Sequence, residues 1–429
     1  MDGAEIATLK SGLRVVVAPV PGVESVTALA MVGVGSRFED KNKNGICHFL
    51  EHLVFKGTAK WPEAFDLSSA VDSIGADFNA FTGKEYTGFY VKSAGVHLEF
   101  ALDVLSDMLC APQLREVDLE REKGVVIEEI NMYNDLPQRQ VGDEFDSLIY
   151  GEVGLGRRID GEREIVRGFT RDDFLEHRKR WYGLNNVVVV VSGSKKALDG
   201  LGKKVAEYFA KGEELGRADG ERVLGFEPQE DRRVRVVYKD SDQAHFILGY
   251  PGLALTHPDR YVLGVLSVVL GGNMSSRLFN EVREKRGLAY YTHCDVDRYI
   301  DTGSIAVAEG VDVKRIDEAV KVSLGVFEEV AGDGEKGVSE EELTKAKDYL
   351  AGKMVLSLED SRSLAQFWGG RLVTGDEIIE PLEVIEKIRS VGRDDVARVA
   401  GELLAERKKL NFSLVGPYKD EERFVKLFG

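Results

Sequence analysis

The chain has 429 residues, which is too long for one ordinary hydrophobic core, so we expect at least two domains. Hydrophobic residues make up 43% and charged residues 31%, as in soluble globular proteins, and no apolar stretch is long enough to cross a membrane. The net charge of −17 argues against partners such as nucleic acid or acidic lipid.

The amino-terminal residues, MDGAEIATLKSGLRVVV, lack a basic start followed by an apolar run, so we expect neither a secretory signal nor a transit peptide. The cysteines, Cys47, Cys110 and Cys294, are few and widely spaced. Such spacing is typical of a protein from a reducing compartment and does not suggest a disulfide framework. We therefore expect a cytoplasmic location.

The first chemically unusual element is GICHFLEHLVFKG, at residues 45–57. We predict a helix that begins at Asn44 or Gly45 and has Lys56 in its last turn. His48 and His52 are four residues apart and Glu51 lies between them, so all three share one helix face. Two imidazoles at this spacing can hold one zinc ion, and the carboxylate can polarise a water bound to it. The pattern alone fits equally well two hydrogen-bonded core histidines beside a chance glutamate.

Residues 75–91, GADFNAFTGKEYTGFYV, predict a strand, a turn at Thr82–Gly83 and a second strand. By itself this pattern indicates an ordinary β-hairpin.

The next candidate site lies in LEREKGVVIEEINMYND, at residues 119–135, which predict a helix. On a helical wheel, Glu129 is surrounded by four apolar or aromatic residues, Val125, Val126, Met132 and Tyr133. Glu122 lies on the same face, whereas Glu128 lies on a more polar side. Carboxylates on an apolar face are unusual without a partner, so we assign Glu129 as a third metal ligand. Glu122 is then the carboxylate behind it that orients a ligating histidine.

The chain repeats itself. Three segments of the first half share short motifs with three segments of the second half, in the same order. The two members of each pair have the same expected structure, and in both halves the series ends in a buried strand. The pairs are 86–105 with 301–320, 169–174 with 391–396, and 185–193 with 410–416. Residues 210–231 are rich in glycine and charge and poor in apolar periodicity. We predict an N-terminal zinc-binding domain at 1–211, a linker at 212–231 and a homologous C-terminal domain without metal at 232–429. Each should be α+β, a sheet with helices packed on one face.

In the second half, SSRLFNEVREKRGLAYY at residues 275–291 predicts a charged amphipathic helix that ends at Gly287. A solvated helix face accounts for it without any function.

These motifs together resemble the pitrilysin or insulinase family of inverted zinc metallopeptidases, which carry H-x-x-E-H. HFLEHLVFKGT, NAFTGKEYTGFYV and VVIEEINMYNDLP are most similar to its short members, mitochondrial processing peptidase and its bacterial relatives. The resemblance covers essentially the whole chain and includes the duplication. It implies Zn2+ on His48, His52 and Glu129, with Glu51 as general base and Glu122 in a supporting catalytic role.

The resemblance also implies functions for the predicted hairpin at residues 75–91 and the predicted helix at residues 275–291. It implies that the first strand of the hairpin is an exposed sheet edge to which a substrate peptide adds as an extra strand, at Phe78, Asn79, Ala80 and Phe81. It further implies an arginine and, seven residues later, a tyrosine that bind substrate and stabilise the transition state, which Arg283 and Tyr290 match. The second half has no H-x-x-E-H and should be catalytically silent.

The sequence therefore predicts a zinc-dependent endopeptidase for peptides or unfolded segments. Because large family members fuse two such chains into a clam-shell with an enclosed chamber, this chain should be one half-shell of a homodimer, with Arg283 and Tyr290 acting in trans. For the partner subunit, a heterodimer with an inactive homologue is the alternative. For the function, the alternatives are a catalytically silent scaffold and a peptide-binding subunit. Cleavage specificity, and processing versus general degradation, do not follow from the sequence.

Overall fold

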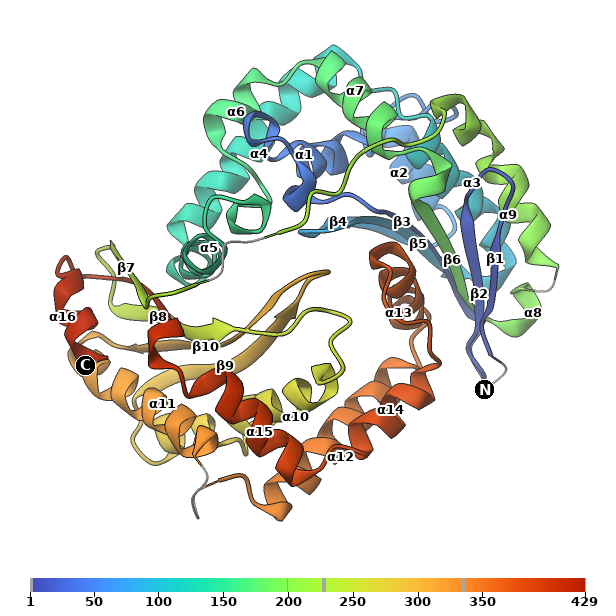
Figure 1. Cartoon of the computed structure of the whole chain (residues 1–429). Helices are drawn as coiled ribbons and strands as arrows, with labels where there is room; N and C mark the ends of the chain where they lie inside the picture. The colour runs from blue at the N-terminus through green and yellow to red at the C-terminus, as the bar shows by residue number, and fades with distance from the viewer. Residues whose placement is uncertain (1–2, 199, 226–228, 333–336, 429) are drawn as a thin grey trace. The chain divides into compact units, whose positions relative to one another are not determined.

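The computed structural model describes residues 3–198, 200–225, 229–332 and 337–428 (Figure 1). Its contacts divide the chain into two compact units, each made of three segments. Unit 1 contains Met1–Ile130, Arg157–Val223 and Val355–Glu380, and unit 2 contains Asn131–Gly156, Leu224–Met354 and Pro381–Gly429. No helix among the described residues is both long and apolar enough to span a membrane.

Unit 1 is built on a six-stranded sheet with the order β1-β2-β6-β3-β5-β4. Only β2 and β6 are parallel; the other neighbours are antiparallel. The strands are β1 (Glu5–Thr8), β2 (Arg14–Pro19), β3 (Ser25–Val32), β4 (Asp77–Thr82), β5 (Thr87–Ala94) and β6 (Val187–Gly193). The helices are α1 (Ile46–Leu53), α2 (Ala64–Asp72), α3 (Leu98–Cys110), most of α4 (Glu116–Asp135), α6 (Arg163–Gly168), α7 (Arg171–Trp181), α8 (Lys195–Leu198), α9 (Leu201–Phe209) and α13 (Ser361–Thr374).

Unit 2 is built on a five-stranded sheet with the order β7-β11-β8-β10-β9. Its strands are β7 (Arg233–Tyr238), β8 (Gln243–Pro251), β9 (Ala289–Arg298), β10 (Gly303–Asp312) and β11 (Asn411–Gly416). Its helices are α5 (Pro137–Tyr150), α10 (Arg260–Leu270), α11 (Ile316–Ala331), most of α12 (Glu340–Ser357), α14 (Pro381–Arg389), α15 (Arg393–Leu404) and α16 (Glu421–Leu427).

The two sheets share one topology. Without β1, the order β2-β6-β3-β5-β4 in unit 1 corresponds strand for strand to β7-β11-β8-β10-β9 in unit 2, and the one parallel pair occupies the same place in both. The α+β class and the duplication expected from the sequence are therefore confirmed.

The central strands are buried because helices cover them. β6 carries five consecutive valines and has no exposed residue, as expected for a β-branched run inside a sheet. On β3, Thr27, Leu29 and Met31 alternate toward α13: Thr27 Oγ1 lies 2.8 Å from Ser361 Oγ, and Gly369 sits directly against Leu29 and Met31. Helix α3 packs on the same sheet from the other side (Figure 1). A helix from late in the chain thus covers the second face of the first sheet.

Unit 2 shows the reciprocal arrangement with a helix from early in the chain. Helix α5 packs on β11 and β8, where Ser413 Oγ donates to Val141 O at 3.0 Å. Its Phe145, Ile149 and Tyr150 form a buried cluster with Leu155. The chain passes between the units at Val223–Leu224, inside the predicted linker, of which residues 226–228 lie outside the described part. The homologous domains at 1–211 and 232–429 stay a prediction, since the compact units additionally exchange these helices.

Candidate active site

Helix α1 is fixed at its start by a buried carboxylate. Gly45 precedes the helix with φ +96°, and an added Cβ there would meet Asp160 O at 2.9 Å, so only glycine fits. Glu39, which is 5% exposed, accepts hydrogen bonds from Gly45 N at 2.7 Å and Cys47 N at 2.8 Å. These bonds satisfy N–H groups that a helix start leaves without an intrahelical partner. Of the two expected starts, Asn44 and Gly45, the structure has Gly45, but the helix ends at Leu53 and does not include the expected Lys56.

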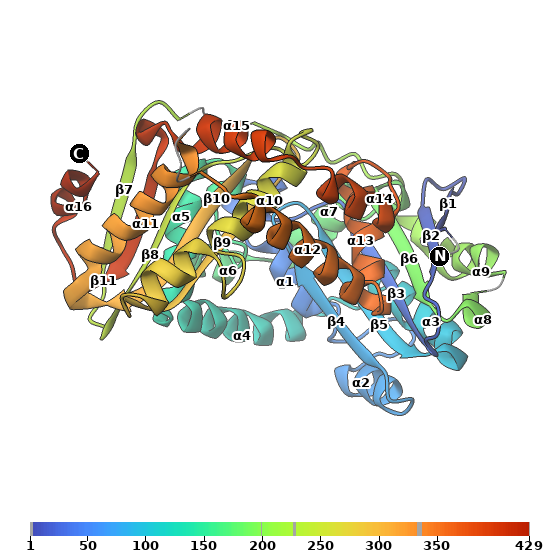
Figure 2. The same ribbon diagram turned by 90° about the horizontal axis from the view of Figure 1, so that it is seen from below.

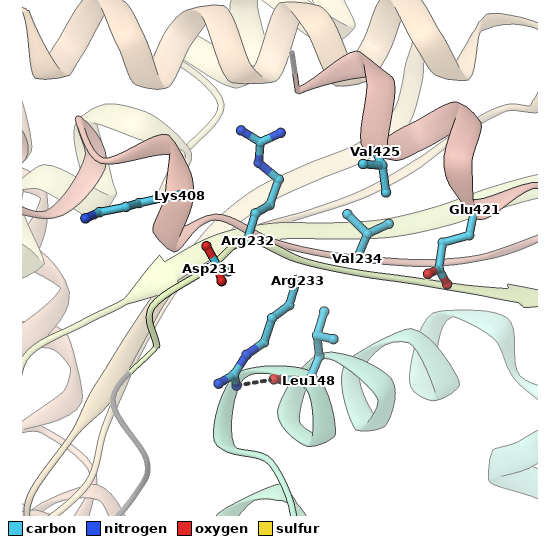
Figure 3. Close-up of a pocket in the computed structure, with 8 residues that line it drawn as sticks. All are labelled: Leu148, Asp231, Arg232, Arg233, Val234, Lys408, Glu421 and Val425. Atoms are coloured by element: carbon cyan, nitrogen blue, oxygen red, sulfur yellow. Dashed lines mark hydrogen bonds between the residues drawn. The ribbon is translucent and has the colours of Figure 1, made fainter.

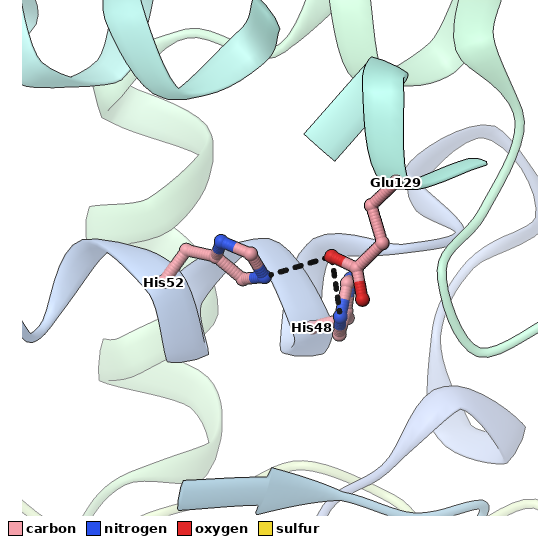
Figure 4. A group of neighbouring side chains, drawn as sticks. All are labelled: His48, His52 and Glu129. Atoms are coloured by element: carbon pink, nitrogen blue, oxygen red, sulfur yellow. Dashed lines mark ion pairs between the residues drawn. The ribbon is translucent and has the colours of Figure 1, made fainter. Parts of the chain in front are cut away.

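The structure brings His48, His52 and Glu129 together (Figure 4). One ligand atom from each lies within 4.8 Å of the other two. Glu129 Oε2 is 3.7 Å from His48 Nε2 and 3.3 Å from His52 Nε2. It is the one such group of three potential ligands found among the described residues.

This donor set fits zinc. Neighbouring ligand atoms around a tetrahedral zinc ion with bonds of about 2.1 Å are roughly 3.4 Å apart. The two measured separations, 3.3 and 3.7 Å, bracket that value. Two imidazoles and one carboxylate leave a fourth position for water, which is the composition of a catalytic site and not of a structural one.

Glu122 lies behind His52. Its Oε2 is 3.7 Å from His52 Nδ1, and its Oε1 is 3.0 Å from Lys56 Nζ. Burial favours the neutral acid, but His52 and Lys56 outweigh it and hold the pKa of Glu122 below its ordinary value. Burial likewise opposes the charge on His52, but Glu122 and Glu129 raise the pKa of His52 to about 9. The carboxylates therefore favour a cation at this position.

The surroundings of α4 differ in part from the prediction. Glu122 is buried, Glu129 is half-buried and Glu128 is exposed, which agrees with the prediction that Glu128 lies on the more polar side. However, Val125 is 48% and Met132 is 50% exposed, so the prediction that Glu129 lies within a broad apolar face was wrong. The buried side is a narrower stripe through Leu119, Glu122, Val126 and Ile130, because α4 contacts its neighbours along one edge.

Glu51 points at the end of the edge strand. Its Oε2 accepts a hydrogen bond from Thr82 Oγ1 at 2.5 Å. Burial is the main cause that raises the pKa of Glu51, and the charge of Glu129 adds to it, whereas the Thr82 hydroxyl acts in the opposite direction. A carboxyl whose pKa lies above its ordinary value is a stronger base than a free glutamate.

Strand β4, which carries the predicted peptide-binding residues, is the terminal strand of its sheet. It pairs with β5 on one side only, and α1 packs beside it (Figure 2). Asn79 is exposed, and Phe78, Ala80 and Phe81 are half-buried. The ring of Phe78 lies 5.3 Å from that of Phe55, just beyond α1. The candidate substrate edge and the histidine cluster are thus neighbours.

Arg283 and Tyr290 lie together in unit 2. Arg283 is on a π-helical turn, Phe279–Glu284, where we expected an α-helix, and Tyr290 follows at the start of β9. The Arg283 guanidinium carbon is 4.9 Å from the Phe279 ring centroid and 5.9 Å from that of Tyr290. Tyr290 is 75% exposed. A π-helical turn rotates side chains out of the α-helical register and is frequent at functional sites.

Three supporting residues were not predicted: Glu39, Lys56 and Thr82. Lys56 lies beyond the end of α1 at Leu53, so the helical spacing that pairs the histidines does not account for its position. Thr82 and Glu39 come from other segments, and no spacing rule connects them to α1.

The Cys47 side chain is directed toward His177, with its Sγ 3.5 Å from His177 Nε2. An open hollow beside β7 is lined by Leu148, Asp231, Arg232, Arg233, Val234, Lys408, Glu421 and Val425 (Figure 3). It contains none of the predicted site residues, and Arg233 is engaged with Leu148 O at 2.8 Å.

Comparison with known proteins gives consistent matches. Residues 14–162 match the family model described as insulinase (peptidase family M16), and residues 168–350 match that of the peptidase M16 inactive domain. An uncharacterised zinc protease of Streptomyces coelicolor is 37% identical, covering 97% of this chain and 90% of that protein. Another, from Bacillus subtilis, is 36% identical and covers 90% and 94%. The crystal structure of a protease from Helicobacter pylori superposes with a TM-score of 0.87 at 25% identity, covering 97% and 99%.

Proposed function

Because this chain belongs to the insulinase family (peptidase family M16), whose similar members carry the name zinc protease, we propose that it is a zinc-dependent endopeptidase for peptides or unfolded segments. The observation that carries the proposal is the cluster of His48, His52 and Glu129 with Glu51 on the same helix. A purely structural zinc site would not need the Glu51 carboxylate.

His48, His52 and Glu129 would hold the zinc ion, and Glu122, 3.7 Å from the other ring nitrogen of His52, would keep that ring oriented. When bound, zinc supplies Lewis-acid chemistry, which lowers the pKa of a water molecule and polarises the scissile carbonyl. Glu51 would accept a proton from the attacking water and later deliver it to the leaving amine. The raised pKa of Glu51 suits both steps. Its carboxylate is a better proton acceptor than that of a free glutamate, and the protonated carboxyl can still return the proton to the amine.

The substrate binds as an added strand along β4. On the unpaired side of β4, alternate residues between Phe78 and Phe81 present backbone N–H and C=O groups with which an extended peptide can pair regardless of its sequence. In the free structure the Ala80 N–H donates to Asn79 Oδ1 at 2.8 Å, so this side chain must give way to the peptide. This mode selects extended or unfolded segments, because a folded substrate has no free strand of this length.

Arg283 and Tyr290 bind the substrate carbonyl and nearby backbone. A guanidinium and a phenol hydroxyl are donors suited to the oxyanion that develops on a scissile carbonyl. In the proposed homodimer they serve the zinc site of the partner subunit, and a heterodimer with an inactive homologue is the other arrangement. The exposed Tyr290 supports a role outside its own unit.

Three single substitutions test the proposal. Native protein should cleave an unfolded peptide library and lose this activity with a chelator. Glu51→Gln should keep zinc, measured by mass spectrometry, and lose about 10²- to 10⁴-fold in kcat, the usual contribution of a general base. Glu129→Gln should lose zinc itself. Glu128→Gln, one residue away and exposed, is the control and should change neither.

If native protein binds zinc but cuts nothing, the chain is instead a silent scaffold or a peptide-binding subunit. If it binds no zinc after reconstitution, the histidines are structural and the enzyme proposal fails.

A further inference from the structure

The contact between Thr82 and Glu51 gives a role to a residue outside the recognised motifs. Thr82 Oγ1 lies 2.5 Å from Glu51 Oε2. A hydroxyl must donate to an ionised carboxylate, and such bonds are short, about 2.5 to 2.7 Å. We infer that Thr82 is a positioning residue that holds one oxygen of the general base and leaves the other oxygen available to the reacting water. The inference rests on the proposed function, because that function makes Glu51 the base.

The Thr82 hydroxyl is held rigidly. Thr82 is the last residue of β4 and pairs with Thr87 of β5 across the hairpin. The turn beyond it is closed by Gly83 N donating to Tyr86 O at 2.8 Å, and Ser36 N donates to Gly83 O at 3.2 Å. A β-branched side chain also has few χ1 rotamers in a strand. The position of Oγ1 is therefore set by the sheet and not by the flexible glutamate.

Glu51 needs such a restraint. Its side chain has three rotatable torsions. Thr82 is the one side chain hydrogen-bonded to the Glu51 carboxylate within the described part of the chain. Without this donor, the carboxylate is free to sample rotamers that turn it away from the water. Catalysis loses rate when a reacting group spends time outside the productive geometry.

The same strand that holds the base also carries the proposed substrate edge. Removing the hydroxyl leaves the backbone of β4 and its pairing with β5 intact, so peptide binding should be unaffected. The inference thus predicts a loss in kcat with little change in KM. It also predicts unchanged zinc affinity, because the Thr82 hydroxyl donates to Glu51 and is not one of the three ligands that the structure brings together.

Thr82→Val and Thr82→Ser separate the hydroxyl from the shape of the side chain. Thr82→Val should lower kcat about 10- to 100-fold. KM and zinc affinity, the latter measured by chelator competition, should stay within about twofold of native, and Thr82→Ser should restore kcat. A crystal structure of metal-free Thr82→Val should show Glu51 in several rotamers and native protein in one. Thr87→Val is the matched control, since Thr87 Oγ1 donates to Val34 O at 2.9 Å and not to Glu51.

Equal kcat in native and Thr82→Val would overturn the inference, and so would a Ser variant as slow as the Val variant. A single Glu51 rotamer in metal-free Thr82→Val would overturn it as well. Absence of zinc-dependent cleavage in native protein is a different result and would count against the proposed function itself.

Discussion

Glu309, in the middle of β10, is a carboxyl group with no exposed surface. Its Oε1 accepts hydrogen bonds from Ser323 Oγ at 2.8 Å and Thr292 Oγ1 at 3.0 Å, and its Oε2 has no hydrogen-bond partner in the described residues. Burial raises the pKa of Glu309 to about 7 against these two bonds. The folded protein therefore binds this proton more tightly than the unfolded chain, in which glutamate has a pKa of about 4.3.

This shift predicts a loss of stability as the pH rises. Below the unfolded pKa the carboxyl is protonated in both states. Above the folded pKa it is ionised in both states, at a cost to the folded state of up to about 4 kcal/mol. The loss should develop between pH 4.5 and 7 and be complete near pH 8. Glu309→Gln, which cannot ionise, should remove that part of the slope. Urea unfolding of both proteins at pH 5 and pH 8 measures it, with the exposed Glu318→Gln as control. Identical slopes in native protein and Glu309→Gln would contradict the prediction.

Sequence reasoning at the scale of single residues worked where one helix carries the pattern. The spacing of His48 and His52 places both rings on one face whatever the tertiary packing, and Glu129 and Glu122 follow the same rule on α4. Thr82 and Glu309 are different, because their importance depends on which side chain lies opposite in space. No pattern along a strand encodes that.

Helix α13 gives an element-scale prediction through two adjacent glycines. A Cβ at Gly369 would lie 2.5 Å from Met31 Sδ and 3.3 Å from Leu29 Cδ2, whereas one at Gly370 would meet nothing within 4 Å. Gly369→Leu should therefore destabilise the protein by about 1 to 3 kcal/mol through overpacking. Gly370→Leu should be neutral or stabilising, since leucine exceeds glycine in helix propensity by roughly 0.5 to 1 kcal/mol.

Denaturant unfolding of the two variants measures the difference directly. Equal free energies of unfolding for Gly369→Leu and Gly370→Leu would show that α13 does not rest on β3 as described.

The elements themselves were largely predictable, but their partners were not. β6 and β11 were expected as buried strands from their apolar runs and are buried throughout. That α5 packs on the second sheet and α13 on the first could not be foreseen, because an apolar helix face indicates burial without saying against what. The π-helical turn at Arg283 was missed for a related reason, since its hydrogen bonding follows from local packing and not from apolar periodicity.

At the scale of the whole molecule, the proposed sharing of sites predicts complementation. In a dimer of one Glu51→Gln chain and one Arg283→Ala chain, one of the two sites has both an intact Glu51 and an intact partner Arg283. Statistical mixing makes half the dimers mixed, so about a quarter of native activity should return. Glu51→Gln mixed with a chain carrying both substitutions is the control and should stay inactive. No recovery, despite mixed dimers isolated by two affinity tags, would mean that each chain completes its own site.

The late position of α13 in the chain has a consequence for biosynthesis. The strands of the first sheet leave the ribosome well before residues 361–374, which cover Thr27, Leu29 and Met31. Until then this apolar face has no covering helix, and domains otherwise fold in the order in which they are made. Chaperones should therefore be needed most while only the first half of the chain has been synthesised. A chain truncated after the first half should aggregate instead of folding.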